Sequence, residues 1–336
     1  MRRQENRRGH DEDFCEGQHL KLGDLKEKAL RTEHLEEEKK IYLFKENIPE
    51  YPRPEFHVTH LQHDTDRDGL KGIRRDNGFR DPFDPHPPGS PRLVWWSLMV
   101  RPEDIQSAER RLLEQIYPDR TEEQVQRQQS FLEKFATSPA FLKSSRLGSY
   151  RFTFPLEELL TAYSQQFCAN AQPVMRVYKT VLYKQEVMYA VLVHSPANEK
   201  LFSKFPLLTD DPNAICVYSN DGHFIWRPEA MCETHSFKLV HRRDENQVEV
   251  KKLFGRDREF YVWDHITVAL HVEDGQVLEF DPDKLRKNLT YCEKGTAPIN
   301  SKEKFDDDKS AEALVEELWP GGGVLVKAQS AEADAV

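Results

Sequence analysis

The stretch from Phe56 to Phe79, FHVTHLQHDTDRDGLKGIRRDNGF, constrains the fold of this chain more than any other. Its pattern predicts the end of a strand that carries His57 and Thr59, then a short polar turn and one amphipathic helix. A strand and helix joined in this way present the two polar side chains at the mouth of a cleft. We therefore expect a ligand to bind near this strand.

The helix within this stretch has clear sequence signals at both ends. Leu70 and Ile73 stand three residues apart, so they share one face of the predicted helix. Asp64 and Thr65 are good N-cap residues, and Gly78 can adopt the left-handed conformation that ends a helix. The helix is therefore predicted to begin just after residue 65 and to end at Gly78.

Charge and cysteine usage exclude several classes of protein. The chain has 48 basic and 58 acidic residues and a net charge of −10, so a broad nucleic-acid surface is not expected, because phosphate binding needs concentrated Lys and Arg. The five cysteines form no CxxC pair, and no apolar run is long enough to cross a membrane or resembles a signal peptide. These features predict reduced thiols, no membrane association and a location in the cytosol or nucleus.

Composition divides the chain into three parts. Residues 1–40 are densely charged and predict a flexible arm or an exposed helix, and residues 293–336 predict an acidic, mostly disordered tail. Residues 41–292 predict one α+β domain with a mixed or antiparallel β core and flanking helices. Helices are expected at 102–117, 121–135, 155–168 and 281–289, and strands at 93–100, 148–154, 173–183, 185–195, 214–219, 223–228, 236–242, 258–272 and 276–280.

Metal sites and common catalytic motifs are not indicated. The acidic run from Asp64 to Gly69 imitates half of a calcium loop, but Arg75 stands where that loop needs a bidentate glutamate. Cys232 and His235 form only one close pair, whereas zinc sites usually use two. We predict no metal. A cysteine- or metal-dependent hydrolase remains a third, weaker hypothesis, since no nucleophile elbow or protease signature is present.

Several separated residues together resemble a known catalytic core. His57-x-Thr59 is followed by a helix that closes in Gly-Phe, then by the aromatic strand with Trp95 and Trp96, and later by a strand that Glu186 opens. Over roughly residues 52–195 this order resembles the ADP-ribosyltransferases, and within them the poly(ADP-ribose) polymerase-like branch with its His–Tyr–Glu set.

The resemblance implies an ADP-ribosyltransferase-like fold, NAD as substrate and mono-ADP-ribosyl transfer to a protein acceptor. It implies that His57 hydrogen-bonds the adenosine ribose with support from Thr59. Trp96 would take the place of the nicotinamide-stacking tyrosine, unless Tyr150 is the true counterpart. Glu186 would be the catalytic residue, because a carboxylate stabilises the positive charge that develops on the ribose as nicotinamide leaves.

The sequence departs from the family pattern in two places. Trp96 replaces the family's tyrosine, and Val58 replaces the glycine that usually follows the histidine. A fold without activity, that is a pseudo-enzyme, is therefore an open alternative. A second alternative is a non-catalytic interaction module on an α+β scaffold, which would bind a protein partner through its β-rich half or its charged ends.

Overall fold

The computed structural model describes the chain except residues 7–8, 34, 36, 47, 83–88, 142–143, 211–213, 232–235, 256–261, 296–304 and 329–336. The Cys232–His235 pair and most of the proline-rich loop before residue 90 lie outside the described residues. No helix in the described part is both long and apolar enough to span a bilayer.

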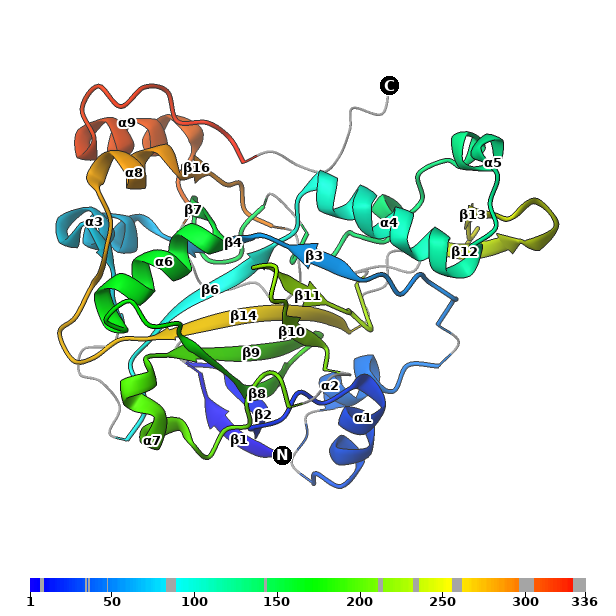
Figure 1. The fold of residues 1–336 in the computed structure, drawn as a ribbon, viewed down its shortest axis with the longest axis horizontal. Helices are drawn as coiled ribbons and strands as arrows, with labels where there is room; N and C mark the ends of the chain where they lie inside the picture. The colour runs from blue at the N-terminus through cyan, green and yellow to red at the C-terminus, as the bar shows by residue number, and fades with distance from the viewer. Residues whose placement is uncertain are drawn as a thin grey trace.

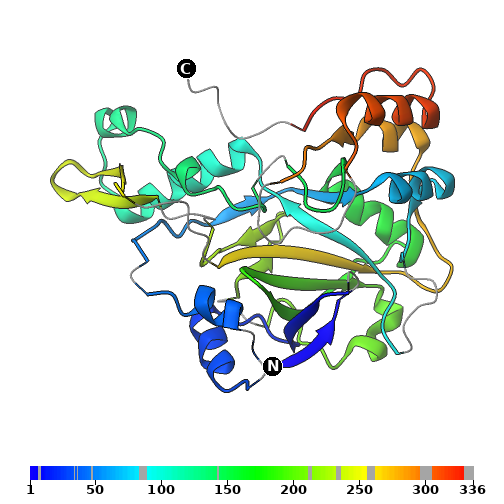
Figure 2. The same cartoon turned by 180° about the vertical axis from the view of Figure 1, so that it is seen from behind.

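One large mixed sheet crosses the middle of the molecule (Figures 1 and 2). Strands β9 and β14 pair in parallel, and the other neighbouring strands pair antiparallel. The α+β prediction with a mixed or antiparallel β core is thus confirmed. In spatial order the strands are β1 (Arg2–Glu5), β2 (Asp11–Glu16), β8 (Val174–Tyr183), β9 (Glu186–His194), β14 (Trp263–His271), β6 (Leu93–Met99), β4 (His60–Thr65), β7 (Tyr150–Pro155) and β16 (Leu289–Tyr291).

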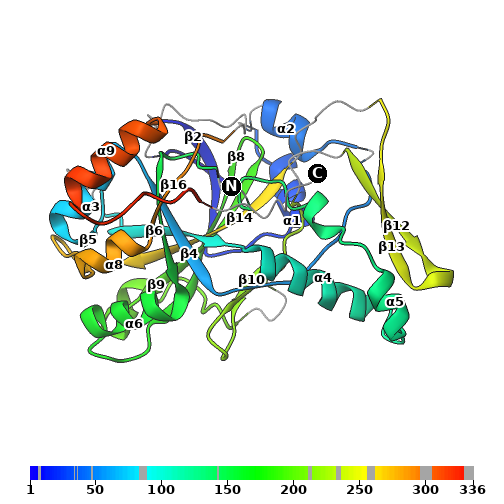
Figure 3. The same cartoon turned by 90° about the horizontal axis from the view of Figure 1, so that it is seen from above.

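Smaller sheets and helices surround this sheet. Figures 1 and 3 show α3, α8 and α9 together at one end, and α5 with the β12–β13 hairpin at the other. The small sheets are β10 (Cys216–Tyr218), β11 (Phe224–Trp226) and β3 (Phe56–Val58); β12 (Phe237–Arg242) and β13 (Gln247–Lys252); and β15 (Leu278–Glu279) and β5 (Gly78–Phe79). The α-helices are α1 (Leu22–Leu30), α2 (Glu37–Leu43), α3 (Arg67–Asp76), α4 (Pro102–Ile116), α5 (Glu122–Arg127), α6 (Leu156–Phe167), α7 (Glu199–Phe202), α8 (Pro282–Lys287) and α9 (Asp308–Leu318), and short 3-10 turns lie at Leu132–Lys134, Pro196–Asn198 and Arg243–Glu245.

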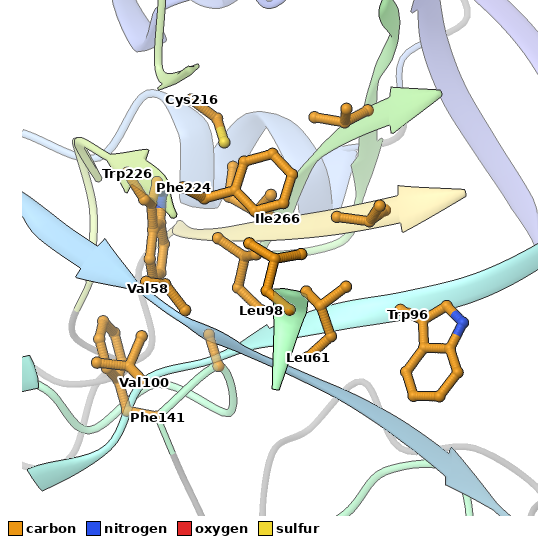
Figure 4. Close-up of a cluster of buried hydrophobic side chains, with 14 of the residues drawn as sticks. Val58, Leu61, Trp96, Leu98, Val100, Phe141, Cys216, Phe224, Trp226 and Ile266 are labelled. Carbon is orange, nitrogen blue, oxygen red and sulfur yellow. The ribbon is translucent and has the colours of Figure 1, made fainter. Parts of the chain in front are cut away.

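The two faces of the large sheet differ in chemistry. Successive side chains of a strand point to opposite faces, and paired residues share a face. One face, which we call the apolar face, carries Leu61, Trp96, Leu98 and Ile266, and Figure 4 shows Leu61, Leu98 and Ile266 beside Phe224 of the three-stranded sheet. The other, which we call the polar face, carries Gln62, Ser97, Glu186, His265 and Thr267.

Aromatic rings hold the helix α3 region against the apolar face. Phe79 follows α3, and its ring centroid lies 4.8 Å from that of Trp96 and 5.3 Å from that of Phe152. All three side chains are buried. Phe79 therefore folds back onto the sheet.

The caps of α3 differ from the prediction by one or two residues. Asp66, rather than Asp64 or Thr65, is the N-cap, and its side chain accepts from Gly69 N. The left-handed residue is Asn77, with φ 50°. Gly78 has a different role, because a Cβ there would lie 2.3 Å from the backbone oxygen of Leu278 in the neighbouring strand β15.

Both charged ends of the chain contain ordered elements, which differs from the predicted arm and tail. Strands β1 and β2 extend the large sheet at its β8 edge. Their charged side chains gave no hydrophobic signal, although Glu12 and Asp13 of β2 are buried, because backbone pairing joins these strands to the sheet without an apolar pattern. Leu25 of α1 is fully buried. At the other end, α9 buries Ala311, Leu314 and Val315, which share one helix face.

The segment 121–135 was predicted as one helix and forms two short elements instead. Helix α5 ends at Arg127, and a 3-10 turn follows at Leu132–Lys134. Glu109 of α4 explains the break, because its carboxylate accepts from the backbone N–H of Phe131 and of Leu132, both at 2.8 Å. Backbone groups held in this way cannot continue the helix.

Candidate functional site

Glu186 opens strand β9, as predicted, and points into the polar face. It pairs with Trp263 of β14, so it shares a face with His265, two residues further along. Glu186 is only 7% exposed to solvent. Arg146 Nη1 donates to Glu186 Oε2 at 2.8 Å, so the carboxylate is held by a charge-assisted hydrogen bond from a loop forty residues earlier in the chain.

Trp96 does not share a face with Glu186. Trp96 pairs with Val268, whereas Glu186 shares its face with His265 and Thr267. Because side chains alternate, the indole of Trp96 lies on the apolar face, where it is 1% exposed. The expected cleft with Trp96 beside Glu186 is therefore not formed. On the polar face lie the half-buried Trp95 and the fully buried Trp263, which pairs with Glu186.

His57 and Thr59 lie away from Glu186. His57 belongs to the three-stranded sheet, where its ring stacks on that of His223 with centroids 4.6 Å apart and its Nε2 lies 2.9 Å from Glu55 Oε1. Thr59 Oγ1 lies 3.0 Å from His60 Nδ1. The structure thus groups His57 with other surface polar residues and not with the carboxylate at β9.

Tyr150 begins β7 and is fully buried, opposite Thr65. Its hydroxyl donates to Asp306 Oδ2 at 2.5 Å. Burial and this acceptor both raise the pKa of Tyr150, so it remains a neutral donor at physiological pH. Tyr150 therefore contacts the segment before α9 and not the Glu186 site.

His265 and Ser97 complete the site around Glu186. Ser97 Oγ lies 3.1 Å from His265 Nε2. Burial lowers the pKa of His265 to about 4, although the nearby charge of Glu186 acts to raise it. The imidazole is therefore neutral at pH 7. The buried hydroxyl of Thr267 on the same face has no hydrogen-bond partner within the described residues. We call Arg146, Glu186, His265, Ser97 and Thr267 the Glu186 cluster.

A second ion pair supports the polar face. Arg151 Nε and Nη2 donate to the two oxygens of Asp64 at 2.6 and 2.8 Å. Burial opposes ionisation of Asp64, but Arg151 outweighs it and holds the pKa of that carboxyl below its usual value. Arg151 also donates to the backbone oxygen of Ser144. This pair therefore anchors the loop that delivers Arg146.

Of the Glu186 cluster, only Glu186 was predicted as a site residue. Polar Asp264, His265 and Thr267 interrupt an otherwise apolar strand, and this interruption was the available signal for His265. Arg146 has no local signal, because its partner lies in a distant strand. A second His-x-Thr pattern, His63 to Thr65, stands directly before α3, and the His63 ring packs on Trp96 and Phe79.

A hollow among the described residues lies elsewhere. It has a volume of about 500 Å³ and lies between α4 and the β12–β13 hairpin. Tyr117, His241 and Arg243 are among its lining residues. It is therefore separate from the Glu186 cluster.

Comparison with protein-family models, with curated proteins and with solved structures gave no match to this chain. The resemblance to ADP-ribosyltransferases stays a prediction from the quoted residues.

Proposed function

We propose that the protein binds NAD on the polar face of the large sheet and transfers ADP-ribose to a protein acceptor, with Glu186 as the catalytic residue. The observation that carries the proposal is the buried Glu186 carboxylate, held by Arg146 beside a neutral imidazole. A fixed carboxylate in a site of low dielectric stabilises the oxocarbenium-like ribose that forms when nicotinamide departs.

The neighbours of Glu186 suit this reaction. The Arg146 guanidinium pairs with the carboxylate at 2.8 Å and fixes its direction. His265 is neutral at pH 7 and can accept a proton from a hydroxyl, such as that of Ser97. The Thr267 hydroxyl, unpartnered within the described residues, is available to hydrogen-bond a ribose.

The proposal changes two of the binding roles that the resemblance implied. Neither Trp95 nor Trp96 stacks on nicotinamide at Glu186, because Trp96 lies on the apolar face and Trp95 pairs with Ala269, six residues along β14 from the Trp263 that pairs with Glu186, which is roughly 20 Å along the strand. His60 replaces His57, because it stands two residues from Gln62 and so shares its face. Burial lowers the pKa of His60, which favours a neutral ring beside a ribose.

Incubation with labelled NAD tests the proposal. The wild-type chain should release nicotinamide and label a protein, and Glu186→Gln should lower the rate by about 10²–10³. Glu199→Gln is the matched control, because Glu199 also pairs with an arginine, Arg176, but lies outside the cluster. Equal rates for wild type and Glu186→Gln would rule out the proposed role of Glu186.

The hollow at the β12–β13 hairpin favours a second candidate function, the non-catalytic interaction module. Its lining residues Tyr117, His241 and Arg243 offer an aromatic ring with polar and cationic groups, which are typical of partner-binding surfaces. Under this alternative, Arg243→Glu would abolish capture of a partner, and Glu186→Gln would leave capture unchanged.

A further inference from the structure

The segment before α9 inserts one carboxylate into the body of the protein. Asp306 Oδ1 accepts from Arg67 Nε at 3.1 Å and from Arg67 Nη2 at 2.9 Å. Its Oδ2 accepts from the Tyr150 hydroxyl at 2.5 Å. The Asp306 side chain is 17% exposed. Charge-assisted bonds from a guanidinium and a short bond from a phenol are the contacts by which proteins bind carboxylates and phosphates.

Two further hydroxyls hold the backbone of the same residue. Asp306 N donates to Ser149 Oγ at 2.8 Å, and Tyr291 OH donates to Asp306 O at 3.1 Å. These donors and acceptors come from α3, the start of β7 and β16, which are far from Asp306 in sequence. Figures 1 and 3 show α9 beside α3 and α8 at this end of the molecule.

Two backbone segments approach closely at the Asp306 contact. Gly148 has φ 148°, and a Cβ there would lie 2.3 Å from the backbone oxygen of Thr65 and 2.5 Å from Asp66 Cα. Only glycine lets the chain before β7 pass so near the N-terminus of α3. The approach brings Tyr150 beside Arg67, the first residue of the helix. The positive end of the helix dipole then adds to the guanidinium charge.

Asp306 is not needed to form α9. The N-cap of that helix is Asp307, whose side chain accepts from Ser310 N. Asp308 pairs with Lys327 at 2.6 Å instead. The helix also packs through its own buried residues. The contact of Asp306 with Arg67 and Tyr150 is therefore separable from folding of the helix.

We propose that Arg67 and Tyr150 form a binding pocket for the phosphate group of a small-molecule ligand. Asp306 occupies this pocket in cis and competes with that ligand. A phosphate offers more acceptor oxygens than a carboxylate and more negative charge, so it satisfies the same donors. The pocket does not involve Glu186, and the proposal holds whether or not Glu186 is catalytic.

Competition in cis predicts how affinity responds to loss of the carboxylate. A ligand that must displace an internal group binds more weakly, in proportion to the fraction of molecules in which the pocket is open. Removal of the Asp306 carboxylate should therefore tighten binding of inorganic pyrophosphate to the full chain by about tenfold or more. The expected gain appears in both Asp306→Ala and Asp306→Asn, of which the second preserves side-chain shape.

Calorimetric titration with inorganic pyrophosphate, at matched ionic strength, is the test. Arg67→Ala in the Asp306→Asn chain should abolish the gain, and the control Asp308→Asn should bind like wild type. The proposal is overturned if both Asp306 variants bind pyrophosphate no more tightly than wild type, or if the gain survives Arg67→Ala. Neither result depends on NAD turnover, so this test is independent of the proposed function.

Discussion

The Asp64–Arg151 pair offers the clearest test of how the polar face is held together. The Arg151 side chain is 3% exposed and that of Asp64 is 11% exposed. Asp64→Asn removes the charge that compensates a buried guanidinium but keeps the shape of the side chain. Breaking a buried pair in this way typically costs about 3–5 kcal/mol of the free energy of unfolding. We expect a loss of that size at pH 7.

Urea unfolding, followed by tryptophan fluorescence, measures this loss. The exposed Asp119→Asn is the control and should change stability by about 0.5 kcal/mol or less. The double variant Asp64→Leu with Arg151→Met should recover most of the loss, because no uncompensated charge remains. If Asp64→Asn lowers the free energy of unfolding by less than about 1 kcal/mol, the reasoning is refuted, because a loss that small is typical of a solvated ion pair.

The pair also predicts a pH dependence. Because the folded-state pKa of Asp64 is lowered, its contribution to stability is present above the unfolded pKa of about 3.9. That contribution is lost as the pH falls through the folded-state pKa. The difference in stability between wild type and Asp64→Asn should therefore shrink in acid. A difference that stays constant down to pH 2 would contradict this assignment.

Three other variants test which face of the sheet each tryptophan lies on and whether Asp264 is a buried acid. Trp96→Ala should lower the free energy of unfolding by about 3–5 kcal/mol, because its indole fills the apolar core, whereas Trp95→Ala should cost clearly less in the same urea titration. Asp264 is fully buried, and burial raises its pKa to about 8. Because the folded-state pKa of Asp264 is raised, the contribution of this group to stability is present below about pH 4 and is lost as the pH rises towards 8. The free energy of unfolding of the wild type should fall between pH 5 and 8 relative to that of Asp264→Asn. If the two proteins show the same pH dependence, Asp264 is not a buried protonated acid.

Local sequence signals predicted several strands of the second half of the chain, but neither β13 nor β16. Lys184, at φ 50°, joins β8 to β9 between the strands predicted at 173–183 and 185–195, and Glu186 then opens β9. Gly222, at φ 81°, lies between the strands predicted at 214–219 and 223–228, which pair as β10 and β11. Asp281 caps α8. These features follow from the backbone preferences of a few adjacent residues, so a single sequence contains them.

The candidate site depends on contacts that no local pattern records. Alternation predicts that Trp95 and Trp96 point to opposite faces, but it does not tell which face is buried. Only the pairing of Trp96 with Val268 decides this. Arg146 and Glu186 likewise meet because distant elements pack together. The family pattern therefore predicted a cleft with Trp96 beside Glu186, but the strand register places these two side chains on opposite faces of the sheet.

The ordered ends of the chain show another limit of composition. Residues 2–5 of β1 are all exposed, so their charges indicated an arm. Pairing of β2 with β8, from Asp13 to Leu182 through Glu16 to Lys179, satisfies backbone groups and needs no apolar side chains. Charge density at an edge strand therefore does not distinguish a sheet edge from a flexible segment.

Calorimetric titration with NAD tests the central claim most directly. We predict saturable binding to the wild-type chain, at least about tenfold weaker binding to Glu186→Gln because a charge-assisted contact is lost, and unchanged binding to Glu199→Gln. Absence of any NAD binding, or equal affinity in all three proteins, would contradict the account.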